Sequence, residues 1–285
     1  FQIAQGNDFF EEIVKIRALR RIWATTMKER FGVNDPRAMH VRIHTHTSGA
    51  MLTAEQPLVN LVRTTLHAFG AALSGVQAME VAAYDEALAI PTEASATLTL
   101  RIQQVIQEET NITAVSDPLA GSYFVENLTE QMAKAALALV EQIEDMGGYI
   151  AAQRQGWIRT EIEENAERWR DDVTAGRRGV VGVNRYKTES AEEPELFTVD
   201  EEVERVAIER VKALRAGRDG PRYDAAMTAF ADAVGEFASA AMGSINPDKL
   251  MSTAIAAAQA DATTGEMMAV MKAKLGWDAP YNYGP

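Results

Sequence analysis

Three side chains that could take part in chemistry occupy alternate positions of one short segment of the sequence: Arg42, His44 and His46. The pattern over residues 39–46 predicts a β-strand, so these side chains share one face of it. A guanidinium on an inward-facing strand needs an anionic partner, and its planar fork suits a carboxylate. That carboxylate could belong to a ligand or to a neighbouring acidic side chain. The two imidazoles could bind a metal ion, but the segment contains no Asp or Glu to complete such a site.

The elements that would position these side chains follow a repeated strand and helix pattern over the first 120 residues. This alternation is typical of βαβ units and of a parallel sheet. Four such units are half the number in a (β/α)₈ barrel. An open doubly wound sheet is the alternative, but these turns lack its glycine-rich phosphate loop. The predicted strands are 1–4, 39–46, 77–83 and 112–116, and the predicted helices are 8–30, 57–73 and 92–109.

Beyond Gly121 the sequence is mostly helical in pattern. A polar, acidic stretch at 187–197 is typical of a linker. The remaining predicted elements are helices at 124–146, 148–156 and 160–175, a strand-like run at 179–184, and helices again from 199 to 275.

The composition excludes several classes of protein. The 285 residues include 41 acidic and 28 basic side chains, a net charge of −13 with no basic tract, so nucleic acid is not an expected partner. No run of apolar residues is long enough for a membrane span, and we expect no membrane partner. The absence of cysteine excludes disulfides and thiolate metal sites and fits a cytoplasmic location. The chain begins at Phe1 in strongly patterned sequence, so we expect a piece of a longer protein.

Five blocks of residues, taken in order, resemble the catalytic subunit of the coenzyme B12-dependent acyl-CoA mutases, the methylmalonyl-CoA mutase family. Together they cover about residues 1–186, and their joint occurrence is far more specific than any one of them. The blocks are Ala4-x-Gly6-x-x-Phe9-Phe10-x-Glu12-Ile13-x-Lys15-x-Arg17-Ala18-x-Arg20-x-x-Trp23-Ala24, Arg42-Ile43-His44-Thr45-His46-Thr47-Ser48-Gly49, Tyr84-Asp85-Glu86-Ala87-Leu88-Ala89-Ile90-Pro91-Thr92-Glu93, Asp117-Pro118-Leu119-Ala120-Gly121-Ser122-Tyr123-Phe124-Val125-Glu126, and Val180-Val181-Gly182-Val183-Asn184.

The resemblance implies an α/β fold that is the second half of a (β/α)₈ TIM barrel, followed by a helical C-terminal region. By analogy, residues 1–122 form the half barrel with strands five to eight, and 123–186 form a helical extension of it. Residues 187–198 are then a linker and 199–285 a C-terminal helical region.

The resemblance also implies partners and a cofactor. The substrate would be an acyl-CoA and the cofactor adenosylcobalamin, bound mainly by a small cobalamin-binding subunit. None of the four histidines lies in the Asp-x-His motif that supplies the family's cobalt ligand. Another chain would carry the first half of the barrel.

Seven residues are candidates for the site, and the resemblance compares three of them with family residues. Arg42 matches an arginine that holds the carboxylate of a malonyl-type substrate, and His46 stands where the family usually has Gln. Glu80 stands where the family has a histidine that hydrogen-bonds the thioester carbonyl, and an ionised carboxylate cannot donate such a bond. Glu80 could stay ionised and pair with Arg42 or His46, or act as a neutral donor. Glu80 and His46 are therefore the catalytic candidates, and the substrate-binding candidates are Arg42, His44, Gln77, Ser48 and Arg101.

The expected activity is a radical 1,2-rearrangement of a carboxylated, malonyl-type acyl-CoA, which makes the chain part of an isomerase that is active only with partner chains. Two alternatives stay open. The chain could serve a different branched, hydroxy or aromatic acyl-CoA, or it could be a catalytically degenerate scaffold subunit.

Overall fold

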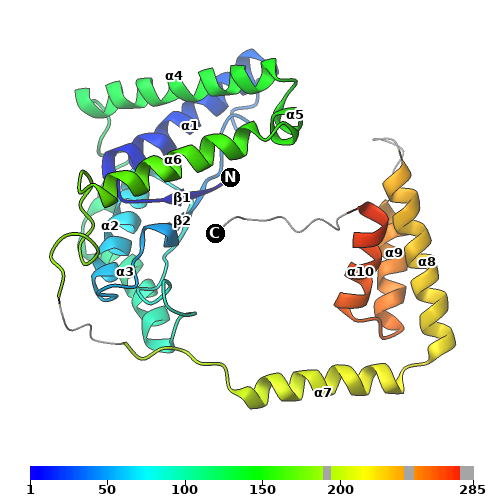
Figure 1. Ribbon diagram of the computed structural model, residues 1–285. Helices are drawn as coiled ribbons and strands as arrows, with labels where there is room; N and C mark the ends of the chain where they lie inside the picture. Colours follow the sequence, from blue (N-terminus) through cyan, green and yellow to red (C-terminus); the bar gives the residue numbers. More distant parts are fainter. Residues whose placement is uncertain (189–193, 241–246, 277–285) are drawn as a thin grey trace. The chain divides into compact units, whose positions relative to one another are not determined.

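A computed structural model describes residues 1–188, 194–240 and 247–276 of the chain. The chain divides into two compact units, Phe1–Thr198 and Val199–Pro285. The first unit contains a small parallel sheet with helices, and the second is built from helices (Figure 1). Among the described residues, no helix combines the length and apolar character that a bilayer span requires.

The sheet of the first unit has three parallel strands in the order β1-β2-β3: β1 (Gln2–Gln5), β2 (His44–Thr47) and β3 (Ala78–Glu80). Helices α1 (Phe9–Glu29) and α2 (Val59–Ser74) connect the strands. The parallel order with a helix in each connection confirms the βαβ pattern predicted from the sequence. β1 has the predicted length and is shifted by one residue, whereas β2 and β3 are shorter than predicted because the ladder of backbone hydrogen bonds covers only part of each predicted range.

One face of the sheet packs on the helices and the other face does not. Ile43, just before β2, contacts buried Ile16 of α1, and Val81, just beyond β3, contacts buried Ala68 of α2. Thr45 of β2 is also buried on this side. The side chains between them in sequence point to the opposite face, where most residues are exposed. The residues of this open face are Gln2, Ala4, Arg42, His44, His46, Ala78 and Glu80.

The fourth predicted strand is not a strand. After α3 (Glu93–Glu109), residues Ile112–Ala114 form a short 3₁₀ helix, η2. Asn111 just before it adopts a left-handed backbone with φ 59°, which turns the chain out of an extended path. Ile112 still packs on the apolar cluster of α2 and α3. The apolar pattern that predicted a strand here therefore arises from burial of Ile112 and not from strand pairing. The described sheet therefore has three strands, and the structure does not confirm half of a TIM barrel.

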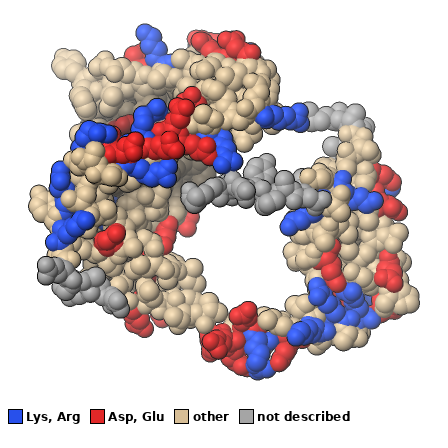
Figure 2. Space-filling model, in the orientation of Figure 1, with Lys and Arg blue, Asp and Glu red and all other residues tan. Residues whose placement is uncertain are grey.

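Helices α4 (Tyr123–Asp145), α5 (Tyr149–Arg154) and α6 (Trp157–Thr174) complete the first unit, and α4 packs along α1 (Figure 1). The Ser122 side chain caps α4 by accepting a hydrogen bond from the backbone N–H of Val125. Acidic and basic side chains lie next to one another over this unit (Figure 2). Several of them form ion pairs between helices, including Arg21 of α1 with Glu130 of α4.

The strand-like run predicted at 179–184 is a tight loop. Gly182 has φ 85°, a conformation that favours glycine. The Asn184 side chain accepts a hydrogen bond from the N–H of Val180 and donates to the carbonyls of Val173 and Arg178. These bonds satisfy the backbone without a neighbouring strand. Residues 189–193 of the predicted linker at 187–197 lie outside the described residues, and the others form no helix or strand.

The second unit contains α7 (Glu201–Gly217), α8 (Gly220–Ser239), α9 (Pro247–Gln259) and α10 (Thr264–Leu275). Phe230 and Val234 of α8 form its apolar core with Ala257 of α9. The described residues of 199–275 are thus mainly helical, as the sequence pattern predicts.

Candidate functional site

The alternation of side chains along β2 creates the candidate site. Thr45 and Thr47 are 1% and 2% exposed on the helix side, whereas His44 and His46 are partly exposed on the open face. The Thr47 hydroxyl accepts a hydrogen bond of 2.7 Å from the N–H of Ala82, which fixes the chain where β3 ends. The predicted common face of Arg42, His44 and His46 is therefore present.

His46 and Glu80 are cross-strand neighbours at the C-terminal end of the sheet. The register pairs them directly, and His46 Nε2 lies 3.9 Å from Glu80 Oε1. This separation is too long for a direct hydrogen bond but gives an ion pair when the imidazole is protonated. Of the two ion-pair partners that the sequence allowed for Glu80, the structure provides His46 and not Arg42.

Glu86 is a third ionisable group at this place, and the sequence did not single it out as a site residue. Its carboxylate lies against the backbone of Gly49, where a Cβ atom would come within 2.1 Å of Oε1. Burial raises the pKa of Glu86, nearby Glu80 and Asp85 raise it further, and His46 opposes them. The available signal was its place in the loop after a strand, because loops at the carboxyl ends of parallel strands converge.

A hollow of about 340 Å³ lies beside these three groups. His46, Glu80 and Glu86 supply its ionisable groups, and Thr99 and Gln103 add neutral polar groups. Its remaining walls are mainly apolar and include Met79 and Leu100. The hollow therefore combines apolar surface with a few polar groups, which is the usual composition of a small-molecule site.

Arg42 lies away from this hollow. It lies two residues before the start of β2 and four positions before His46, about 13 Å along an extended chain. Its side chain is exposed and its carbonyl accepts a hydrogen bond of 2.7 Å from the amino group of Phe1. Among the described residues the guanidinium forms no ion pair. No acidic side chain of the described residues thus competes for Arg42 with a substrate carboxylate. Arg42 does not line the hollow, however, so the carboxylate-binding role predicted for it is not located there.

The other predicted binding residues are spread over the unit. Gln77 binds backbone at the other end of the sheet: its Oε1 accepts from the N–H of Ile43 at 2.8 Å. His44 lies one layer below His46, in register with Ala78. Ser48 follows β2 directly, and its N–H donates to the Gln5 carbonyl at 2.7 Å.

Arg101 lies on α3, where it is exposed and donates a hydrogen bond to Gln104. It does not line the hollow. The structure thus brings His46 and Glu80 together at the hollow, whereas Ser48, Gln77 and Arg101 do not line it.

No metal site accompanies these residues. Within the described ranges, no group of three or more His, Asp or Glu side chains is arranged to hold a metal ion. The metal-binding alternative for His44 and His46 therefore gains no support.

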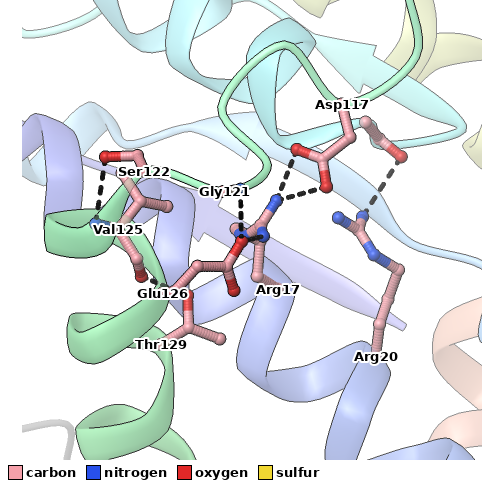
Figure 3. A network of polar contacts seen from close by, with 9 residues as sticks. Arg17, Arg20, Asp117, Gly121, Ser122, Val125, Glu126 and Thr129 are labelled. Atoms are coloured by element: carbon pink, nitrogen blue, oxygen red, sulfur yellow. Dashed lines mark hydrogen bonds and ion pairs between the residues drawn. The ribbon is translucent and has the colours of Figure 1, made fainter.

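Two of the blocks that carry the family resemblance meet far from the hollow (Figure 3). Arg17 of α1 pairs through one guanidinium nitrogen with Asp117 and through the other with Glu126 of α4, the latter at 2.7 Å. Glu126 also accepts a hydrogen bond of 3.0 Å from the N–H of Gly121. The Arg17 side chain is only 10% exposed. These residues join α4 to α1, so the role of the matching residues in this part of the chain is to pack the two helices together.

Comparisons with known proteins agree with the resemblance. The family model described as methylmalonyl-CoA mutase matches residues 1–277. The 2-hydroxyisobutanoyl-CoA mutase large subunit of Aquincola tertiaricarbonis is 39% identical over 95% of this chain and 47% of its own length. Methylmalonyl-CoA mutase of Escherichia coli is 37% identical over 92% of this chain and 35% of its own length. The mitochondrial methylmalonyl-CoA mutase of Homo sapiens is 35% identical over 95% of this chain.

The chain spans less than half the length of these curated relatives. The family match nevertheless extends over nearly all of the chain and includes both compact units. The chain belongs to the methylmalonyl-CoA mutase family.

Proposed function

We propose that this chain is part of the catalytic subunit of an acyl-CoA mutase, an isomerase that moves a group between adjacent carbons of an acyl-CoA. The observation that carries the proposal is the family match over residues 1–277. The open face of the sheet supports it, because His46, Glu80 and Glu86 meet at the C-terminal ends of parallel strands, where such folds place their sites.

The proposed cofactor is adenosylcobalamin, bound by a partner chain. When bound, it supplies the radical chemistry of the rearrangement. The residues of this chain do not fit the role of a cobalt-binding domain. None of the four histidines has aspartate two positions before it, and His67 is buried with its Nε2 2.6 Å from Asn7 Oδ1. We therefore assign to this chain the binding of the acyl-CoA.

The open sheet face indicates a further partner. Gln2, Ala4, Ala78 and Glu80 are exposed on it, and β1 pairs with a neighbour on one side only in the described sheet. An unpaired parallel strand beside an uncovered face is normally covered by other elements. We propose that a chain carrying the first half of a (β/α)₈ barrel completes the structure, with β1, β2 and β3 as barrel strands.

Within this arrangement the open face becomes the inner wall that lines the substrate. His46 can donate a hydrogen bond to the thioester carbonyl when it carries a proton on Nε2. The Glu80 carboxylate faces this imidazole across the two strands, with Oε1 3.9 Å from His46 Nε2. The covering chain would exclude water from these groups and so strengthen their electrostatic effect. Glu80 is then a positioning residue for His46.

The test is reconstitution of the complex. This chain is purified with the chains that co-purify with it, and acyl-CoA isomerisation is followed with and without adenosylcobalamin. Turnover that requires both the cofactor and this chain is expected. A complex that binds cofactor and CoA and isomerises no acyl-CoA in a broad panel would overturn the proposal and favour a scaffold role.

A further inference from the structure

The His46 end of the hollow carries two carboxylates and a single imidazole. Glu80 lies 3.9 Å from His46, and Glu86 is near enough to both for their charges to shift its pKa. At neutral pH the three groups sum to −2 with a neutral imidazole and to −1 with a protonated one. The hollow therefore presents negative charge to whatever enters it.

No basic side chain offsets this charge within the described residues. The hollow is lined by neither Lys nor Arg. Arg42, the basic residue on the same face of the sheet, lies about 13 Å along the strand from His46. A substrate carboxylate placed here would face like charges, and like charges at close range discriminate strongly against a ligand.

Glu86 is better held than Glu80 to recognise a ligand. Glu80 is 65% exposed, while the Glu86 carboxylate is fitted against the backbone of Gly49. Glu86 is exposed in this chain taken alone. An acceptor fixed in this way rewards a matched donor, and it penalises a ligand that leaves it unpaired once the covering chain excludes water. An ionised carboxylate accepts hydrogen bonds and donates none.

We propose, resting on the proposed mutase function, that the acyl group taken by this hollow ends in an uncharged hydrogen-bond donor such as a hydroxyl, and that Glu86 selects it by accepting that hydrogen bond. A hydroxyl satisfies the carboxylate without adding charge, and the apolar walls accommodate the carbon chain around it. A malonyl-type acyl group brings a third carboxylate and is disfavoured.

The test uses the complete complex and two ligand classes. Binding of a hydroxyacyl-CoA and of malonyl-CoA is measured by calorimetry, and turnover is measured with hydroxyacyl-CoA and malonyl-type substrates. We expect the hydroxyacyl-CoA to bind at least tenfold more tightly and to be isomerised with the higher kcat/KM. Equal or tighter binding of malonyl-CoA would overturn the inference even if the complex is an active mutase. A complex that prefers hydroxyacyl-CoA in binding but isomerises nothing would contradict the mutase function alone.

Two variants test Glu86 itself. Glu86→Gln removes the charge at constant size, and Gly49→Ala displaces the carboxylate because the added Cβ would lie 2.1 Å from Oε1. Both are expected to reduce the preference for the hydroxyacyl ligand at least tenfold. The control Glu29→Gln changes an exposed glutamate at the end of α1 and should leave the preference unchanged. An unaltered preference in folded Glu86→Gln and Gly49→Ala complexes would exclude Glu86 as the selecting residue.

Discussion

At the residue scale, the contact between His46 and Glu80 matters for activity and not for stability. Glu80 is mostly exposed and the two side chains are 3.9 Å apart, so their contact contributes little to folding, under about 1 kcal/mol. The same two groups face the hollow from the C-terminal end of the sheet. Their importance therefore lies in what they present to a ligand.

This leads to a prediction for His46→Leu. Turnover by the complex should fall by about tenfold or more, because Leu cannot donate the hydrogen bond proposed for His46. The free energy of unfolding in urea should change by less than about 1 kcal/mol. His40→Leu is the matched control, since His40 is an exposed imidazole outside the hollow. Equal losses of turnover in the two variants would contradict a role for His46.

A second residue-scale prediction concerns acid sensitivity at His67. Burial, together with the nearby charge of Arg63, lowers the pKa of His67 to about 4. The side chain is 2% exposed on α2, and Nε2 lies 2.6 Å from Asn7 Oδ1. The unfolded chain binds a proton near pH 6.5 that the folded chain rejects until about pH 4, so stability falls as pH decreases through this window.

The expected loss of unfolding free energy between pH 7 and pH 4 is on the order of 2–3 kcal/mol. Urea unfolding at a series of pH values measures it. His67→Gln lacks the titrating group and can still donate to Asn7, so its stability curve should be flatter over this window. The same slope in both proteins would show that other groups cause the acid sensitivity.

At the scale of elements, Arg17 fastens α4 to α1. It is 10% exposed and pairs with two carboxylates on a segment 100 or more residues away (Figure 3). Removing one partner of a largely buried network leaves the other charges unpaired. Arg21 forms a pair between the same two helices, but its side chain is 55% exposed.

We therefore predict that Arg17→Met lowers the free energy of unfolding by about 2 kcal/mol, and that Arg21→Met lowers it by less than about 1 kcal/mol. Urea unfolding of the first unit, followed by circular dichroism, compares the two. Both arginines pair α1 with α4, so the two variants differ mainly in how deeply the arginine side chain is buried. A loss in Arg21→Met as large as that in Arg17→Met would contradict the proposed packing role.

The N-terminus of α10 gives an element-scale prediction in the second unit. Burial by itself raises the pKa of Glu266, but hydrogen bonds from the Thr263 backbone and hydroxyl and from Arg218 outweigh it and lower the pKa to about 2. Thr263 and Glu266 form a capping box. The folded state thus favours the ionised carboxylate, and its contribution is present above about pH 4.5 and is lost as pH falls towards 2.

Glu266→Gln retains the capping geometry but not the charge. It should lower the stability of the second unit by about 1 kcal/mol at pH 7 and by less near pH 2. Thermal unfolding at both pH values provides the measurement. A penalty that is independent of pH would show that the charge is not what stabilises the cap.

The elements also show how far the sequence can predict this structure. The helices and the βαβ order follow from apolar periodicity, which α1 and α3 retain along their lengths. The strand predicted at 112–116 failed because Ile112 is apolar for packing on α2 and α3, and a pattern of burial does not distinguish a strand from a buried turn. Glu86 was not singled out because its proximity to Gly49 depends on two loops that are distant in sequence.

At the scale of the whole chain, the open sheet face is the main structural fact. The family match covers nearly the full chain, yet the chain spans 47% of one relative and 35% of another. A parallel sheet of three strands with one face uncovered is rarely found alone, because such sheets are normally covered on both faces. We expect this chain to be found in a complex.

Light scattering of the purified chain, alone and with co-purifying chains, tests this expectation. The chain alone should associate or aggregate through its open face, and the complex should be monodisperse. Adding the covering chain should also protect the backbone amides of β1 from hydrogen exchange. A monodisperse monomer whose β1 amides are equally protected in both states would contradict the need for a partner.

The function proposed for this chain is a part in the 1,2-rearrangement of an acyl-CoA. The most direct measurement gives the reconstituted complex an acyl-CoA that is isotopically labelled at the thioester carbonyl, and follows by NMR the carbon to which the label is bonded. We expect the labelled carbonyl to become bonded to the adjacent carbon, and we expect no such change when this chain or adenosylcobalamin is omitted. A complex that contains both and leaves the label on its original carbon, or releases it by hydrolysis, would contradict the claim.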